Sequence, residues 1–105
     1  PMLMLCGDNF ATRLPDPVLQ QLEHFGNPTL GVTDAFKSVS RFWDRITHPA
    51  QVLNSLPAAL NTMLDPADCG PAFIALPQDL QGWAWDYPEA FFAPRAHRIR
   101  RAAPD

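Results

Sequence analysis

The sequence predicts an α/β domain with an open, mostly parallel sheet and flanking helices. Two short apolar runs, residues 2–6 and 72–76, contain no charged residue and end at Gly7 and Pro77. Such runs are typical of strands that are buried on both faces of a sheet. Two stretches with helical periodicity and a further candidate strand lie between them. Because a helix that connects two strands of one sheet makes them parallel, this order of elements predicts the architecture.

The first helix is expected from residue 17 to residue 25. Asp16 can cap its N-terminus, Pro17 suits its first turn, and Gly26 ends it. Its apolar positions recur at helical spacing: Val18, Leu19, Leu22 and Phe25. Residues 29–33 then suit a second strand, which gives a right-handed βαβ unit.

The region from residue 38 to residue 46 has a mixed pattern, and we expect an irregular or extended crossing segment. A second helix is expected between His48 and Asp65, followed by the strand at residues 72–76. Its apolar stripe consists of Val52, Leu53, Leu56, Leu60, Met63 and Leu64. An interior proline costs about 3 kcal/mol, so the helix should bend or break at Pro57 unless it starts late enough to hold that residue in its first turn.

Strands that are apolar on both faces need helices on both faces, and only two good helices are present. The sequence also begins at Pro1 directly before an apolar strand. We therefore expect the chain to be the back part of a larger domain. Association into a homo-oligomer is expected to hide the face that remains uncovered.

Composition indicates a soluble, cytoplasmic module of one domain. The chain has 105 residues, of which 47% are hydrophobic and 18% charged, and no apolar run approaches the roughly 20 residues that span a bilayer. Cys6 and Cys69 lack closely spaced Cys or His partners, so we expect reduced thiols. The three histidines are far apart, which argues against a shared metal site.

The charge is unevenly distributed. Residues 1–94 contain four basic and ten acidic residues, whereas residues 95–105 contain four arginines and one aspartate. A basic strip behind an acidic body is more often solvated than bound to nucleic acid, so we expect no nucleic-acid partner.

Two loops are the best candidates for a functional site. Residues 7–10 and 33–37 leave the carboxyl ends of predicted parallel strands, where open α/β sheets bind ligands. The alternative is that Asp8 and Asp34 only cap turns or helices. No glycine-rich phosphate loop is present, so the sequence shows no means of holding a diphosphate.

Residues 82–92 concentrate five aromatic side chains: Trp83, Trp85, Tyr87, Phe91 and Phe92. We expect this block to pack against a neighbouring domain or subunit, because so many large apolar side chains rarely remain in water. The alternative is a stand-alone interaction module that docks a partner through this C-terminal segment.

Several motifs together resemble thiamine-diphosphate-dependent enzymes, and most closely the ring-opening hydrolases of myo-inositol degradation. They lie at residues 7–13, 15–21, 34–37, 41–46 and 76–79, and the resemblance covers essentially all of the chain. It implies an incomplete pyrimidine-binding domain, with residues 1–80 as its later part. Residues 81–105 would lead towards a missing central domain.

The resemblance also implies a reaction. With thiamine diphosphate and Mg²⁺, the parent enzyme would open a cyclic 1,2-dione by breaking a carbon–carbon bond and adding water, which gives a 5-deoxyglucuronate. A related synthase or decarboxylase is the alternative. In the chain itself Asp8 and Asn9 would bind the cyclic polyol dione, Lys37 would polarise a carbonyl, and Phe36 would exclude water.

The chain departs from the family in two places. The glutamate that activates the cofactor and the motif that binds Mg²⁺ and the diphosphate would both lie outside these residues. The resemblance therefore implies no catalytic residue and no metal ligand in this chain. We expect the chain alone to be inactive and to bind no cofactor.

Overall fold

The computed structural model describes residues 1–12, 26, 31–67 and 69–98. These residues form a three-stranded sheet in the order β1-β3-β2, in which both pairs are parallel. The strands are β1 (Leu3–Asp8), β2 (Phe42–Arg45) and β3 (Ala72–Pro77). The predicted open, parallel α/β fold is therefore confirmed. The helix expected at residues 17–25 lies outside the described residues.

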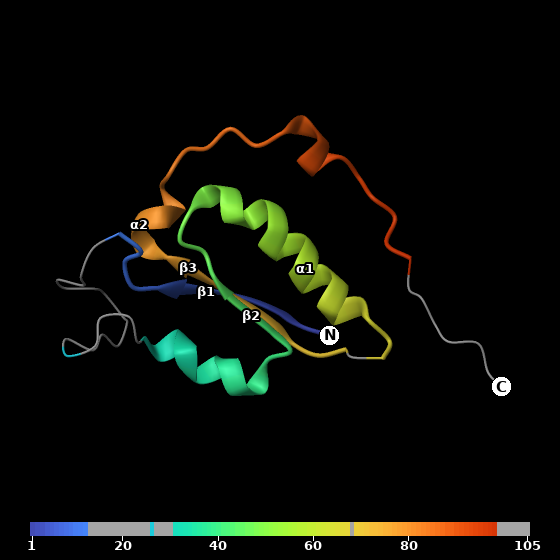
Figure 1. The fold of residues 1–105 in the computed structure, drawn as a ribbon, viewed down its shortest axis with the longest axis horizontal. Coiled ribbons are helices and arrows are strands. Elements are labelled where there is room, and N and C mark those ends of the chain that lie inside the picture. The colour runs from blue at the N-terminus through green and yellow to red at the C-terminus, as the bar shows by residue number, and fades with distance from the viewer. Residues whose placement is uncertain (13–25, 27–30, 68, 99–105) are drawn as a thin grey trace.

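The strand register assigns side chains to the two faces of the sheet. Ala72 pairs with Leu3 and with Phe42, so these three side chains share one face. Helix α1 (Val52–Leu64) packs on that face, where the core consists of Ile46, Ala59, Ala72, Ile74 and Leu80. The 3₁₀ helix η1 (Val32–Val39) lies on the opposite side of the sheet (Figure 1).

Phe73 of β3 is the centre of the face that η1 covers. Its side chain is fully buried. The Phe36 ring stacks on it with centroids 5.0 Å apart, and the Trp43 ring stacks on it at 6.0 Å. Each helix therefore covers the central strand from one side, which confirms the doubly buried strand predicted at residues 72–76.

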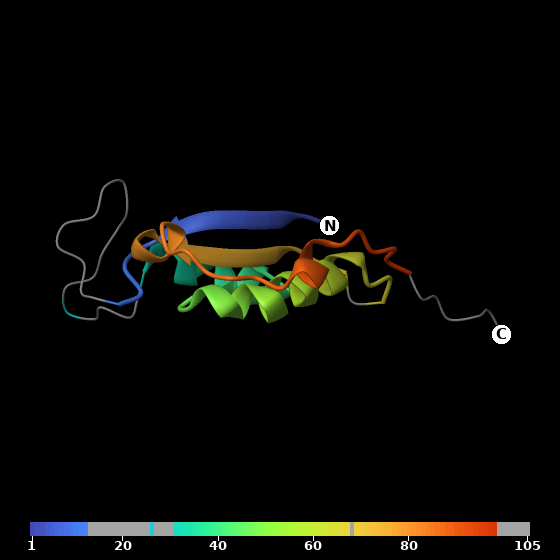
Figure 2. The ribbon, with the colours of Figure 1, turned by 90° about the horizontal axis from the view of Figure 1, so that it is seen from above.

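The same burial was expected for β1, and that prediction is wrong. Leu5 is 58% exposed, because β1 is an edge strand and the two helices lie towards β2 and β3 (Figure 2). Helix α1 makes the core with β3 and β2, and only Leu3 of β1 joins it.

The second strand expected at residues 29–33 is also wrong in its described part. Gly31 forms only a bridge, and η1 begins at Val32. The Asp34 carboxylate accepts a hydrogen bond from the Gly31 N–H at 2.7 Å, and the Asp34 N–H donates to the Gly31 carbonyl at 3.1 Å. This reciprocal pair closes a helical turn where the apolar pattern favoured a strand.

The third strand of the sheet lies instead in the region for which an irregular or extended segment was predicted. The extended alternative is correct for Phe42–Arg45. Its pattern looked mixed because the strand is only half-buried and places one polar residue on each face. Asp44 bonds to Ser55 of α1, whereas Arg45 bonds across the other face to Asp8.

Helix α1 continues through Pro57, so the chain does not break there, and a bend at this residue stays a prediction. A 3₁₀ turn, η2 (Pro49–Gln51), precedes it, and the His48 ring caps that turn by accepting the Ala50 N–H at 3.1 Å. Pro57 removes one backbone donor from the interior of the helix. Burial of Ala59 and the bond from Ser55 to β2 hold the helix on the sheet on both sides of the proline.

No helix in the described part of the chain is long and apolar enough to span a membrane.

Candidate functional site

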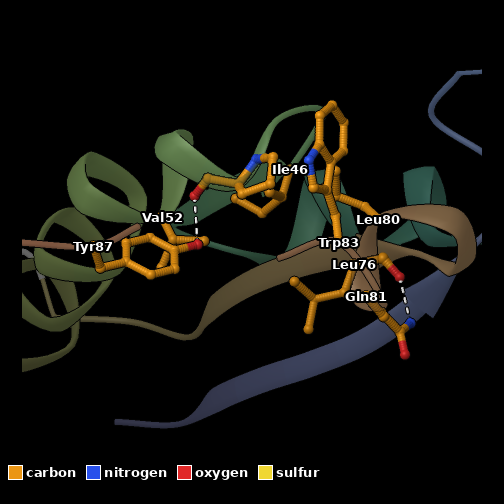
Figure 3. Close-up of a pocket in the computed structure, with 8 residues that line it drawn as sticks. Ile46, Val52, Leu76, Leu80, Gln81, Trp83 and Tyr87 are labelled. Atoms are coloured by element: carbon orange, nitrogen blue, oxygen red, sulfur yellow. Dashed lines mark hydrogen bonds between the residues drawn. The ribbon is translucent and has the colours of Figure 1, made fainter. Parts of the chain in front are cut away.

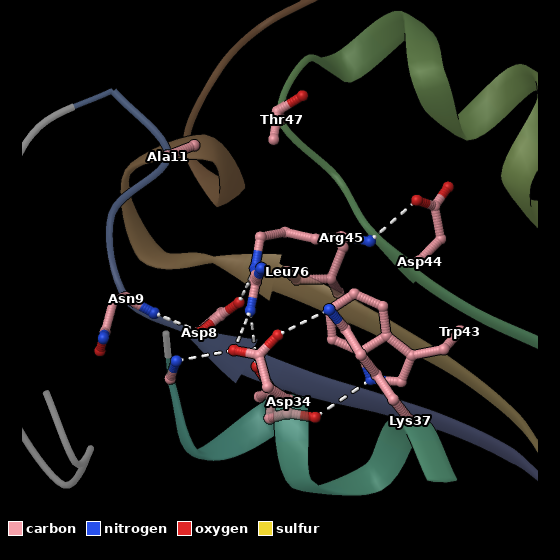
Figure 4. A network of polar contacts seen from close by, with 12 residues as sticks. Asp8, Asn9, Ala11, Asp34, Lys37, Trp43, Asp44, Arg45, Thr47 and Leu76 are labelled. Carbon is pink, nitrogen blue, oxygen red and sulfur yellow. Dashed lines mark hydrogen bonds and ion pairs between the residues drawn. The ribbon is translucent and has the colours of Figure 1, made fainter. Parts of the chain in front are cut away.

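The candidate site is a polar network at the carboxyl ends of β1 and β2 (Figure 4). Arg45, the last residue of β2, contacts two carboxylates. Its Nε atom donates to Asp8 Oδ2 at 2.5 Å, and its Nη2 atom donates to Asp34 Oδ2 at 2.9 Å. Nη2 also lies 3.3 Å from the Thr33 hydroxyl, and Lys37 Nζ lies 3.0 Å from Asp34 Oδ1. We call these five residues the Arg45 network.

The alternation of β2 explains why Arg45 points to this side. Trp43 and Arg45 are two residues apart and share the face that η1 covers. The Trp43 indole N–H donates to the Thr33 carbonyl at 3.0 Å and so ties β2 to η1. Its ring lies 4.9 Å from the Arg45 guanidinium carbon and 4.5 Å from Lys37 Nζ. Both cations therefore rest on an aromatic surface that attracts positive charge.

Two ionisable groups of the network have shifted pKa values. Burial opposes ionisation of Asp34, but hydrogen bonds from the Gly31 N–H and from Arg45 and Lys37 outweigh it. They hold the pKa of Asp34 below its ordinary value of 3.8. Burial likewise opposes the charge on Arg45, and its bonds to Asp8 and Asp34 raise its pKa overall. Asp34 and Arg45 are thus each stabilised in the charged form.

Because the pKa of Asp34 is lowered in the folded chain, the free energy of unfolding should fall at acidic pH. A carboxyl group whose pKa is lower in the folded than in the unfolded chain stabilises the fold above the unfolded value and loses that contribution as the pH falls through the folded value. We expect the free energy of unfolding to be level between about pH 7 and 5 and to fall steeply below the ordinary value of 3.8. Urea unfolding at a series of pH values measures it. Asp34→Asn should flatten the decline, and an equally steep decline in that variant would contradict this assignment.

Asp79 joins the loop after β1 to the start of α2 (Gln78–Gln81). Its carboxylate accepts hydrogen bonds from the Ala11 N–H at 2.8 Å and the Thr12 N–H at 3.0 Å, and from the Thr12 hydroxyl. Burial opposes ionisation, but these bonds outweigh it and lower the pKa of Asp79. The Gln78 N–H also donates to the Asn9 carbonyl at 2.9 Å. These bonds fix the backbone that carries Asp8 and Asn9.

Asn9 and Gly31 lie beside Asp8. Asn9 is 8% exposed, and its N–H donates to Asp8 Oδ1 at 2.9 Å. Its side-chain amide makes no hydrogen bond within the described residues. A Cβ atom added to Gly31 would lie 3.1 Å from Asp8 Oδ1 and 3.6 Å from Asn9 Nδ2, so the glycine lets three segments approach one another.

The structure brings together three of the four residues predicted as the site. Asp8 and Lys37 are in the Arg45 network, and Asn9 is adjacent to it. Phe36 is instead stacked on Phe73, and its proposed role in excluding water stays a prediction. The sequence reasoning missed Arg45, because its partners are 37 and 11 residues away. The alternation of Trp43 and Arg45 was the signal available for it.

A second feature is an apolar pocket of about 260 Å³ between α1, β3 and the C-terminal segment (Figure 3). Its lining consists of Ile46, Pro49, Val52, Leu76, Leu80, Gln81, Trp83 and Tyr87. The Tyr87 hydroxyl donates to the Pro49 carbonyl at 2.7 Å, and Gln81 Nε2 donates to the Leu76 carbonyl at 2.8 Å.

The aromatic block at residues 82–92 is packed only in part on its own chain. The His48 ring lies 4.6 Å from the Trp85 ring and 5.2 Å from the Trp83 ring, centroid to centroid. Both tryptophans remain partly exposed, and Phe92 is 69% exposed. Packing of this block against another domain or subunit therefore stays a prediction, as does the docking of a partner.

The described residues contain no group of three or more His, Cys, Asp or Glu side chains that could hold a metal ion. Cys6 and Cys69 form no disulfide in the described part of the structure, and their reduced state stays a prediction. The Arg45 network and Asn9 together present three kinds of polar group to a ligand. These are carboxylate oxygens held in fixed positions, the Asn9 amide and the half-exposed ammonium group of Lys37.

Comparison with known proteins finds several relatives that share one name. The chain is 53% identical over 104 residues to a 3D-(3,5/4)-trihydroxycyclohexane-1,2-dione hydrolase of Geobacillus thermodenitrificans. It is 50% identical over 104 residues to the hydrolase of that name from Bacillus cereus, and 52% identical over 101 residues to that from Clostridium perfringens. These alignments cover 96–99% of this chain but 16% of each relative. No family model and no solved structure matches the chain.

Proposed function

We propose that this chain forms part of a 3D-(3,5/4)-trihydroxycyclohexane-1,2-dione hydrolase. The observation that carries the proposal is the identity of 53% over 99% of the chain to an enzyme of that name. Within the enzyme, residues 1–80 would be the later part of the N-terminal pyrimidine-binding domain. Residues 81–105 would lead towards the central domain. The parallel α/β sheet, with its polar groups at the carboxyl ends of the strands, supports this assignment.

The proposed reaction is hydrolytic opening of the cyclic dione by cleavage of a carbon–carbon bond, with thiamine diphosphate and Mg²⁺ in the parent enzyme. Thiamine diphosphate supplies the stabilised carbanion that such cleavage needs. The described residues do not fit the diphosphate and Mg²⁺ end of this cofactor. They include no cluster of metal ligands, and both cations of the Arg45 network already pair with carboxylates. That end of the cofactor would be held by other parts of the parent.

Within the proposal, this chain contributes to binding of the substrate. Asp8 and Asn9 would bind hydroxyl groups, because carboxylate and amide groups are their usual partners. Lys37 would polarise a carbonyl. Its side chain is 54% exposed, and within the described residues its ammonium group forms an ion pair with Asp34, so further N–H donors face solvent and can bind a ligand. Phe36 would exclude water beside this site.

The test replaces the matching segment of the Geobacillus thermodenitrificans hydrolase with this chain and measures consumption of the trihydroxy dione by the purified hybrid. We expect the hybrid to turn over the dione. The chain alone is expected to give no turnover, and titration with thiamine diphosphate and Mg²⁺ should leave its tryptophan fluorescence unchanged. A folded hybrid without activity would contradict the proposal. A saturable fluorescence change in the chain alone would contradict the division of the cofactor site.

A related thiamine-dependent synthase or decarboxylase is the alternative, and the names of the relatives favour the hydrolase. Homo-oligomerisation, a cytoplasmic location and the lack of a nucleic-acid partner stay predictions. The exposed apolar side chains of Leu5 on β1 and of Met2, which directly precedes this strand, support association with further polypeptide.

A further inference from the structure

We propose that Asp79 is a positioning residue for the substrate site, because its carboxylate holds the loop after β1, residues 9–12, in one conformation. This inference rests on the proposed function, since it assigns an effect on substrate binding to a residue outside the Arg45 network. Asp79 does not itself touch the substrate in this account. The inference is carried by bonds between two segments that lie 67 and 68 residues apart in the chain.

The first observation is the point at which the sheet stops fixing β1. The parallel pairing of β1 with β3 ends at Asp8 and Pro77. The Gln78 N–H donates to the Asn9 carbonyl at 2.9 Å and extends this connection by one residue. The sheet therefore fixes the backbone of Asp8, whereas the loop that starts at Asn9 needs a further anchor.

Asp79 supplies that anchor with both of its carboxylate oxygens. Oδ1 accepts the Ala11 N–H at 2.8 Å, and Oδ2 accepts the Thr12 N–H at 3.0 Å together with the Thr12 hydroxyl. Hydrogen bonds to an ionised acceptor are roughly twice as strong as bonds between neutral groups. The loop is thus held at Asn9 by the end of the sheet and at Ala11 and Thr12 by Asp79.

The charge on Asp79 belongs to this arrangement. Burial opposes ionisation, but the bonds from Thr12 and Ala11 outweigh it and lower the pKa of Asp79, so the carboxylate is charged at neutral pH. An asparagine at this position would offer one acceptor oxygen in place of two. Asp79→Asn can therefore keep only part of the anchor.

Loss of the anchor should weaken substrate binding in a way that differs from loss of stability. Asn9 lies between the two anchored points, and a loop held at one end only must be ordered when the substrate binds, which costs affinity. Weaker binding raises KM with little change in kcat. A merely structural role would reduce the amount of folded enzyme, which lowers the apparent kcat and leaves KM unchanged.

The first test measures amide hydrogen exchange in the 105-residue chain by NMR, and its result does not depend on the identity of the parent enzyme. In Asp79→Ala the amides of Asn9, Ala11 and Thr12 should exchange about tenfold faster, because the loop opens more often. The amide of Ile74, which is buried on the central strand, should change less. Unchanged exchange at Asn9, or an equal increase at Asn9 and Ile74, would overturn the proposal.

The second test uses the hybrid hydrolase. Asp79→Ala should raise KM for the trihydroxy dione about tenfold and change kcat less than about twofold. Asp79→Asn should raise KM less. Thr12→Val removes only the hydroxyl bond and should raise KM about twofold, so it keeps the test decisive if the Asp79 variants do not fold. Asp65→Ala is the matched control, since the Asp65 carboxylate accepts the Ala67 N–H at 2.8 Å in the turn after α1, and it should leave both constants unchanged.

The outcomes separate this inference from the proposed function. An inactive hybrid with the unchanged segment would count against the proposed function, and the exchange test then decides by itself whether Asp79 anchors the loop. An active hybrid in which Asp79→Ala lowers kcat and leaves KM unchanged would overturn the positioning role, because only folded enzyme would have been lost. An active hybrid in which both constants stay the same would overturn it as well.

Discussion

Replacing Arg45 with methionine is expected to lower the free energy of unfolding by about 3 kcal/mol. The variant keeps the length and packing of the side chain and removes its charge. Asp8 and Asp34 would then be two nearly buried carboxylates without the guanidinium that joins them. Removal of one member of a buried ion pair is costly because the charge that remains is uncompensated. Urea unfolding at pH 7 measures the loss.

Two further variants test the reason for this effect. Arg95→Met removes an exposed arginine whose hydrogen bond within the described residues is a long one to the Ala90 carbonyl at 3.3 Å, so it should change stability by less than about 0.5 kcal/mol. Arg45→Lys should restore only part of the loss, because an ammonium group cannot reproduce the fork that reaches both carboxylates. If Arg45→Met were as stable as Arg95→Met, the network would have no structural importance.

Phe73→Ala is expected to cost about 3–5 kcal/mol, the usual range for truncation of a fully buried aromatic side chain. Phe73 lies on the central strand, and the rings of Phe36 and Trp43 both stack on it. Its removal leaves a cavity under η1 and takes away the surface on which both rings stack. Because domains of this size have only about 5–15 kcal/mol of stability, a large share of the variant should be unfolded at modest urea concentrations.

Circular dichroism during urea titration gives the midpoint for this variant. Phe92→Ala is the matched control, since Phe92 is 69% exposed in the 3₁₀ helix η3 (Glu89–Phe92) and its loss should change little. Similar midpoints for the two variants would show that Phe73 is not the centre of this face of the core.

The parts of the fold that follow from local patterns were predictable. β3 is a short apolar run on a central strand, and α1 has an apolar stripe, so residue type and spacing alone indicate both. Pro57 shows the limit of this reasoning. A local cost of about 3 kcal/mol predicts a break, and the packing of α1 against the sheet outweighs it.

The errors have a common physical cause, which is that the deciding contacts are distant in sequence or made by single polar atoms. Residues 31–33 have the apolar character of a strand, but the bond between Asp34 and Gly31 turns the chain into η1. The alternation of β2 places Arg45 on the same face as Trp43, but no local feature identifies the carboxylates that it binds. Its position follows only when β1 and β2 are known to lie on either side of β3, which brings Asp8 within reach.

The measurement that tests the central proposal most directly is kcat/KM of the hybrid hydrolase for 3D-(3,5/4)-trihydroxycyclohexane-1,2-dione. The identity of 53% over the exchanged segment predicts a folded hybrid with kcat/KM within about tenfold of the parent enzyme. Arg45→Met in the hybrid should reduce that value, because the residues that face the substrate would lose their fixed positions. A hybrid that folds and assembles like the parent but consumes no dione would contradict the assignment of this chain to the hydrolase.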